Sequence, residues 1–541
     1  MVDFLSREIG EGMFEDMDLT SALAWIVAFL IVTVTVTGLS RRVGWSAPVA
    51  LIAIGAGVSF VPWVPRVDVQ PDFVLSVLLP PLLFAAALRM SFIDVRARRD
   101  SILLLSVGLV GFTVITVGLV TWLVVPTLSL AAAFAFGAVV APTDAVAVTA
   151  VTRRTKLPRL LTTLLDGESL LNDATALVAL NASIAAIVAV FNPFNAAADF
   201  VVAVICAVGV GLVGGTAIAE VRRRLSAPVL DTCLSLVTPF VIFLTAQAIG
   251  GSGPLAVVVA GLLLGYRAPA IQSAEARIAE SLNWRTIQFI LENAVFLLIG
   301  LSLPSILAGA LSSGISLPRA FLIIAAVLAT LFGGRAAWSL FITAIFRWGP
   351  PVLRRRQWTW RTNVPVTLAG IRGVVTLAAV FLLPESTPHR GFLQFLAFVV
   401  VVVSLLQALA LPWAIRLIAL PAPNLAQERM EVQLLTAEAQ NEGLRHLESL
   451  ADLGNAEERV FVRLRANASF LDTAGDDPES TTTRSNEYAR LRMLMIAVER
   501  RTTLAARAEG RYQEPAVRAV LTLLDIEEAA VRAAAVGPED D

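Results

Sequence analysis

Charged residues, histidine and cysteine are all scarce in this sequence. Only 16% of the 541 residues are charged, and there are two histidines and two cysteines. Soluble domains carry about a quarter charged residues, so an ordinary soluble fold is a poor match. Cys206 and Cys233 lie in apolar stretches, and two such thiols supply neither a disulfide framework nor a metal-binding spacing. The net charge of −1 leads us to expect no nucleic-acid partner.

Groups for enzymatic chemistry are equally sparse. We find no nucleophile–base pair and no cluster of metal ligands, so we expect neither an enzyme nor a resident cofactor. His389 and His446, the only histidines, fall outside the apolar segments. Proton handling inside a membrane would therefore have to use carboxylates.

Long apolar runs dominate the chain instead. It is 57% hydrophobic, with a mean hydropathy of +0.75. Runs of about 18 or more apolar residues recur, and each can cross a hydrocarbon core of roughly 30 Å. We therefore expect an all-α polytopic membrane protein, embedded in a lipid bilayer, with about 13 transmembrane helices. The expected spans are 19–39, 47–64, 73–90, 101–125, 128–151, 164–191, 199–219, 229–249, 253–266, 286–309, 319–346, 364–384 and 392–420.

Arginine and lysine are concentrated in alternate loops between these spans. The positive-inside rule makes the basic loops cytoplasmic, which places the N-terminus outside and the C-terminus inside. Residues 1–18 are acidic and lack the basic start of a signal peptide, so we do not expect a cleaved signal peptide. With the N-terminus outside, we expect these residues to form an extracellular segment. We expect a transmembrane domain over 19–420 and a cytoplasmic helical tail over 421–541, where Ala, Glu, Arg and Leu prevail. Charged helix faces are usually only solvated, and regulatory contacts of the tail are the alternative.

Six ionisable residues lie well inside expected spans, away from the basic cytoplasmic ends. Such residues are costly in a bilayer, so each is a candidate for function, and a structural ion pair is the alternative for any one of them. Asp166 and Asp231 also fall in spans, but both lie near the basic cytoplasmic ends of their segments and receive no site assignment. The six are Asp144, Glu168, Asp173, Glu292, Arg335 and Arg372.

The segment LDGESLLNDATAL holds three acids within one span. On a helix, Ser169 and Asp173 share one face, and Glu168 and Asn172 share the adjacent face. Hard monovalent cations are bound by oxygen ligands, so a hydroxyl above a carboxylate suits a cation site.

The preceding span reads AFGAVVAPTDAVAVTAV. Pro142 removes a backbone donor and favours a helix break just before Thr143 and Asp144. A broken helix at membrane depth frees carbonyls that can line an ion site, and an ordinary proline kink is the alternative.

Arg372 lies between Gly370 and Gly373, which permit local unwinding or close helix approach. Its guanidinium and that of Arg335 are both candidates to neutralise Glu168. Glu292 is a further acid at membrane depth.

The motifs APTDAVAV, GESLLNDATALV, SGPLAVVVAGLLLG and GIRGVVTLAA together resemble the bacterial Na+/H+ antiporters of the monovalent cation:proton antiporter-1 family, the sodium/hydrogen exchangers. The resemblance covers about Ser21 to Leu420, and the tail is similar as well. It implies a homodimer in the bacterial plasma (inner) membrane, with inverted repeats and two crossed broken helices in a mobile core. Transport would alternate between the two sides of the membrane.

The resemblance also assigns roles. It implies that Asp173 is the essential ion- and proton-binding carboxylate, with Asp144, Ser169 and Thr143 at the same Na+ site. Asn172 in place of a second acid implies one H+ per Na+.

Supporting roles follow from the same resemblance. Glu168 with Arg335 looks like the family's buried ion pair, and Arg372 looks like the residue that steadies the broken helices. Glu292 is a supporting acid on the ground of its depth in the membrane alone. Two positions depart from the family pattern: Ala145 replaces a proline of the broken helix, and Gln247 replaces an acid.

We therefore expect electroneutral exchange of Na+, and of Li+ as a second cation, for H+. K+/H+ antiport and sodium-coupled uptake of an organic anion are the alternatives among transporters, and a channel or membrane sensor is a third class.

Overall fold

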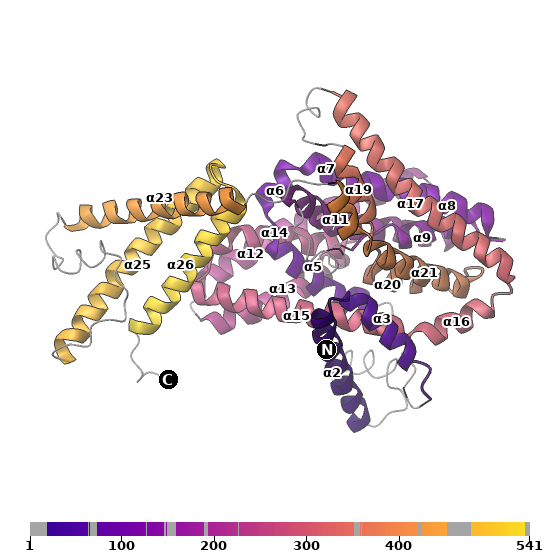
Figure 1. The fold of residues 1–541 in the computed structure, drawn as a ribbon, viewed down its shortest axis with the longest axis horizontal. Coiled ribbons are helices and arrows are strands. Elements are labelled where there is room, and N and C mark those ends of the chain that lie inside the picture. Colours follow the sequence, from indigo (N-terminus) through magenta and orange to yellow (C-terminus); the bar gives the residue numbers. More distant parts are fainter. Residues whose placement is uncertain are drawn as a thin grey trace. The chain divides into compact units, whose positions relative to one another are not determined.

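The computed structural model describes residues 19–62, 64, 73–125, 127–144, 148, 158–188, 193–225, 227–350, 358, 360–418, 425–451 and 478–535. Across these residues the regular structure is helical and contains no strand, which confirms the expected all-α class (Figure 1).

The helices up to residue 418 carry the membrane-type sequence. They are α2 (Leu19–Val43), α3 (Ala47–Val58), the π-helical turn η1 (Val74–Leu78), α5 (Leu79–Arg89), α6 (Phe92–Ala97), α7 (Arg99–Leu103), the π-helical turn η2 (Leu104–Gly108), α8 (Leu109–Val124), α9 (Leu130–Val140), α11 (Arg159–Val188), α12 (Pro193–Arg224), α13 (Pro228–Ala248), α14 (Gly253–Ile271), α15 (Ala274–Leu301), α16 (Leu303–Leu311), α17 (Leu317–Trp348), α19 (Trp360–Leu368), α20 (Val374–Phe381), α21 (Arg390–Ala408) and α22 (Leu411–Ile418). The C-terminal helices are α23 (Leu425–Ala451), α25 (Pro478–Glu509) and α26 (Glu514–Ala535).

Every expected span overlaps at least one of these helices. Within the described ranges, nine helical segments are long and apolar enough to cross a membrane. Three further apolar helices, 47–58, 74–89 and 130–140, are shorter, and the expected span at 364–384 is divided between α19 and α20. The chain is thus a multi-pass membrane protein, while the count of 13 crossings and the inverted repeats stay predictions.

Helix α17 shows how the sequence positions a charge inside the protein. It begins after Ser316, with a proline in its first turn, and ends at Trp348 before Gly349. Both are ordinary signals for a helix start and stop. Its buried side chains recur every three or four residues along one face, as helical packing requires. They are Ile323, Val327, Leu331, Arg335, Ser339, Ile342 and Phe346. Arg335 therefore lies on the packed face of the helix.

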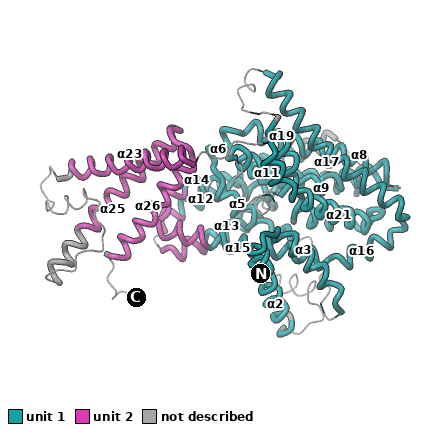
Figure 2. Tube along the Cα trace, viewed as in Figure 1, with its two compact units in different colours: residues 1–221, 234–267, 283–423 teal, residues 222–233, 268–282, 424–541 magenta. Residues whose placement is uncertain are grey.

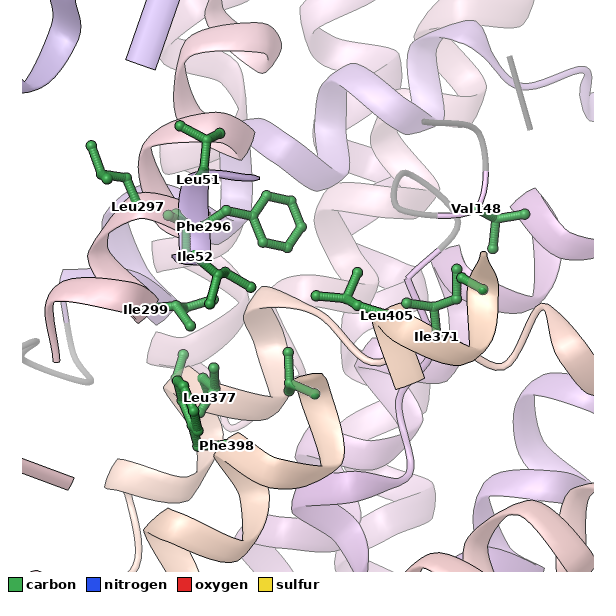
Figure 3. Packing of buried hydrophobic residues seen from close by; sticks show 14 of the residues in the cluster. Leu51, Ile52, Val148, Phe296, Leu297, Ile299, Ile371, Leu377, Phe398 and Leu405 are labelled. Atoms are coloured by element: carbon green, nitrogen blue, oxygen red, sulfur yellow. The ribbon is translucent and has the colours of Figure 1, made fainter. Parts of the chain in front are cut away.

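The chain divides into two compact units, coloured separately in Figure 2. The first unit holds residues 1–221, 234–267 and 283–423. In its interior, α9 packs against α8 and α11, and α17 packs against α8 and α19. A large apolar cluster joins α3, α15, α20 and α21, and it includes Ile371 and Val148, which lie close together in Figure 3.

The second unit holds residues 222–233, 268–282 and 424–541. Helices α23, α25 and α26 pack together around buried aliphatic side chains such as Leu435, Ile496 and Val520. Charged side chains also join its segments: Asp525 of α26 pairs with Arg277 of α15 and, at 2.9 Å, with Arg500 of α25. The tail residues therefore do fold as helices that pack on one another, whereas their cytoplasmic location stays a prediction.

Candidate functional site

The first unit, called the membrane unit from here on, contains two interruptions of its helical structure, and the first of these helix breaks follows α9. This helix ends at Val140, two residues before Pro142, and residues 141–144 are not helical. Pro142 accounts for the stop, because proline cannot donate the helical hydrogen bond. Ala145, where the family pattern has proline, lies outside the described residues.

The second break separates α19 from α20. Residues Ala369–Gly373 form an irregular connection, and the backbone nitrogen of Asp144 donates a 2.7 Å hydrogen bond to the Ile371 carbonyl. The two breaks therefore touch through their main chains. Such irregular backbone is stable at membrane depth only where protein groups satisfy it.

Arg372 satisfies the freed carbonyls of both breaks. Its Nε donates to the Val140 carbonyl at 3.1 Å, and its Nη1 donates to the Gly370 carbonyl. Its backbone nitrogen donates to Ser404 Oγ at 2.9 Å. The guanidinium is 1% exposed and lies at the carboxyl ends of α9 and α19, where helix carbonyls concentrate partial negative charge. A cation there stabilises both half-helices.

Arg335, and not Arg372, forms the ion pair with Glu168. The contact is bidentate, at 2.5 Å between Nη1 and Oε1 and 3.0 Å between Nη2 and Oε2. Both side chains are 1% exposed. The Nε of Arg335 also donates to the Val366 carbonyl of α19 at 2.9 Å. The pair thus ties α11 to α17 and α19.

Asn172 and Glu168 both hold Thr143 of the first break. The Thr143 hydroxyl donates to Glu168 Oε1 at 3.0 Å. The Asn172 amide donates to the Thr143 hydroxyl at 2.7 Å and to its carbonyl at 3.3 Å. The amide nitrogen is therefore occupied in positioning the broken segment, a use that a carboxylate could not fulfil, because it has no donor.

The remaining polar side chains face a shared cavity of about 340 Å³ within the membrane unit. Thr143, Asp144, Ser169 and Asp173 all line it, so the structure brings together the four residues expected at the ion site. Asp173 is 8% exposed, and no described residue donates a hydrogen bond to its carboxylate. Asp144 is near enough to interact with it electrostatically. The cavity wall thus offers two neighbouring carboxylates, two hydroxyls and an irregular backbone.

Gly373 is required for this arrangement. A methyl group at this position would overlap the Asp144 carboxylate, with Asp144 Cβ only 2.8 Å away. The glycine therefore lets α20 begin against the acid, as expected from the glycines that flank Arg372.

Glu292 lines the same cavity, together with three polar residues that the sequence reasoning did not assign to a site. The Gln288 amide donates to Glu292 one helical turn away. The three residues are Arg89, Asp166 and Gln288. The four-residue spacing that places Gln288 and Glu292 on one face of α15 could have been recognised in the sequence. The approach of α5 and α11 to that face could not, because it depends on tertiary packing.

The fold and the site define a polytopic membrane protein with a charged cavity between broken helices. The family model described as the transmembrane sodium/hydrogen exchanger matches residues 27–417. The chain therefore belongs to the sodium/hydrogen exchanger family, and the resemblance of its motifs is confirmed. As a member of a transporter family, it is a transporter and not an enzyme.

Two relatives illustrate the match. An uncharacterised Na+/H+ exchanger of Mycobacterium tuberculosis is 30% identical over 540 residues, covering 96% of this chain and 97% of the relative. A sodium, potassium, lithium and rubidium/H+ antiporter of Bacillus subtilis is 32% identical over 405 residues, covering 71% of this chain and 60% of the relative.

A solved structure has a similar fold. The sodium proton antiporter MjNhaP1 of Methanocaldococcus jannaschii superposes with a TM-score of 0.56 at 18% identity, covering 74% of this chain and 99% of that one. At this identity the likeness concerns the fold.

Proposed function

We propose that this protein exchanges Na+ for H+ across the bacterial plasma membrane, with Li+ as a second cation. Family membership supports cation/proton antiport. Several relatives are named for Na+/H+ exchange, among them a Na+/H+ antiporter of Aphanothece halophytica. The observation that carries the proposal is the exposure of Asp173 to the cavity without a hydrogen-bond donor from any described residue.

Competition at Asp173 couples the two ions. Its carboxylate binds either a proton or a sodium ion, because one negative charge cannot hold both. Ser169, Thr143 and Asp144 supply the further oxygen atoms that a hard cation needs. Alternating access of the loaded site to each side then exchanges the two ions.

The ion pair and the amide support electroneutral exchange. Glu168 is neutralised by Arg335, and Asn172 holds Thr143, so neither residue adds a titrating charge to the cavity. One proton for one sodium ion follows if Asp173 is the only carboxylate that exchanges its occupant. A homodimer with a cytoplasmic tail is part of the same proposal.

K+/H+ exchange is the second candidate, because the Bacillus subtilis relative is named for potassium as well as sodium. Uptake of an organic anion is disfavoured by the cavity wall, which carries four acids: Asp144, Asp166, Asp173 and Glu292. A negatively charged substrate would be repelled there.

Proton flux in everted vesicles tests the proposal. Addition of Na+, Li+ or K+ to acidified vesicles should collapse the pH gradient, with Na+ and Li+ effective at the lowest concentrations. Equal responses to choline would contradict antiport, and a response to K+ alone would favour the second candidate. Insensitivity of the exchange rate to membrane potential would support the one-to-one stoichiometry.

A further inference from the structure

The cavity that holds Asp173 has a second group of polar side chains about two helical turns away. On α11, Asp166, Ser169 and Asp173 follow one another at helical spacing, and all three line the cavity. Seven residues of helix rise about 10 Å, so Asp166 is too far from Asp173 to share one ion with it. Any role of Asp166 in cation binding therefore needs its own ligands.

Helix α15 supplies those ligands. Gln288 and Glu292 lie one turn apart and both line the cavity. The Nε2 of Gln288 donates to Glu292 Oε1. A carboxylate only accepts hydrogen bonds, so the amide oxygen of Gln288 must point away from Glu292.

The amide oxygen of Gln288 is a buried hydrogen-bond acceptor without a donor among the described residues. Gln288 is 8% exposed, and its Oε1 receives no hydrogen bond from any described residue. A buried acceptor without a donor destabilises the protein, and a bound cation or its hydration water would offset that cost. Gln288 lines a cavity that also presents two carboxylates, and hard cations select such oxygen chemistry.

One arginine, Arg89, lines the cavity beside the same group. Arg89, at the end of α5, interacts electrostatically with Glu292 and Asp166 and also with Arg285 of α15. A cation that binds the carboxylates therefore displaces arginine contacts. The site should therefore bind cations with low affinity. Low affinity suits a site through which ions pass, because the ions must leave it again.

We propose that Asp166, Gln288 and Glu292 form an outer binding site for the transported monovalent metal cation, on the path to Asp173, with Arg89 as the built-in counter-ion. The inference rests on the proposed function for its direction of transport. The arrangement of the side chains at the site does not depend on that function. All four residues lie in the halves of their expected spans that the charge pattern assigns to the cytoplasm, so this is the entry site for cytoplasmic cations.

Binding to purified protein tests the outer site without transport. In Asp173→Asn protein, NaCl or KCl should still raise the apparent melting temperature saturably above an equal concentration of choline chloride. At ten times the dissociation constant we expect a rise of about 3 °C. Adding Asp166→Asn or Gln288→Leu should abolish that rise. The leucine variant changes no charge, so it separates ligation from long-range electrostatics.

Asp94→Asn is the matched control. Asp94 lies on α6, is partly exposed like Asp166, and does not line the cavity. In the Asp173→Asn background this variant should keep the full stabilisation. An equal loss with Asp94→Asn, or no saturable stabilisation by Na+ or K+ in Asp173→Asn protein, would overturn the outer site. Elution on size exclusion confirms folding, and Asp166→Glu should retain binding.

Transport kinetics complete the test. With Asp173 intact, Asp166→Asn and Gln288→Leu should raise the apparent KM for Na+ three- to tenfold at an unchanged maximal rate, and Arg89→Gln should lower the KM. A reduced maximal rate with an unchanged KM would contradict an entry site. If the Asp173→Asn protein is stabilised saturably by Na+ but the wild type shows no Na+-driven proton flux, the proposed function fails while the outer site stands.

Discussion

Removing one partner of the buried Glu168–Arg335 pair should destabilise the membrane unit strongly. In Arg335→Met, the Thr143 hydroxyl is the one hydrogen-bond donor that Glu168 keeps among the described residues, and the Val366 carbonyl loses the donor that Arg335 supplied. Breaking a buried ion pair costs about 3–5 kcal/mol. A lost hydrogen bond to a buried carbonyl adds about 1 kcal/mol. The expected loss is therefore about 4–6 kcal/mol.

The apparent melting temperature in detergent measures this loss. At about 2–4 °C per kcal/mol, Arg335→Met should melt roughly 10–20 °C below the wild type. Glu168→Gln combined with Arg335→Met removes both charges and should recover at least half of the difference. Arg319→Met removes an exposed arginine of the same helix and should change the melting temperature by less than about 2 °C.

Two outcomes would refute this reasoning. The first is an Arg335→Met protein that melts within about 2 °C of the wild type. The second is a double variant no more stable than the single one, because the cost would then come from lost packing and not from an unpaired charge.

Two further predictions concern backbone space and pH. Gly373→Ala should reduce ion exchange at least tenfold in folded protein, because the added methyl group overlaps Asp144. In the control variant Gly209→Ala the added methyl group meets open space, so the flux should not change. Equal flux in the two variants would contradict the close approach of Gly373 to Asp144. A hydrogen bond from Arg511 lowers the pKa of Glu438 from its ordinary value of 4.5. The interaction of Arg511 with ionised Glu438 therefore stabilises the fold above pH 4.5, and this stabilisation is lost as the pH falls through the lowered pKa. Hydrogen exchange in α23 of the intact protein should accelerate over this acidic range, and Glu438→Gln should remove the pH-dependent step; an unchanged step would show that another group causes it.

The membrane class and the polar residues that line the cavity could be predicted from sequence, because a charged side chain in an apolar segment is visible in the sequence itself. Asp173, Ser169 and Asp144 are conspicuous in apolar surroundings, and Pro142 marks the end of α9. The pairing of Glu168 could not be derived from spacing, since two arginines were equally plausible and the partner depends on how α17 packs.

The outer site shows a second limit of prediction from sequence. Arg89 and Asp166 lie near span ends, where ionisable residues are ordinary. Their significance comes from the approach of α5, α11 and α15 around one cavity, which is a tertiary property. The ends of α9 and α19 also depend on tertiary contacts: the buried Arg372 donates to the Val140 carbonyl at the end of α9 and to the Gly370 carbonyl that follows α19.

The central claim is that Asp173 carries both ions, and one measurement tests it most directly. Wild-type and Asp173→Asn proteins are reconstituted in proteoliposomes, and Na+-driven proton flux is followed by dequenching of a pH-sensitive dye. The account predicts that the variant elutes like the wild type on size exclusion but shows no Na+-driven dequenching at any pH. Full dequenching with the Asp173→Asn protein would contradict it.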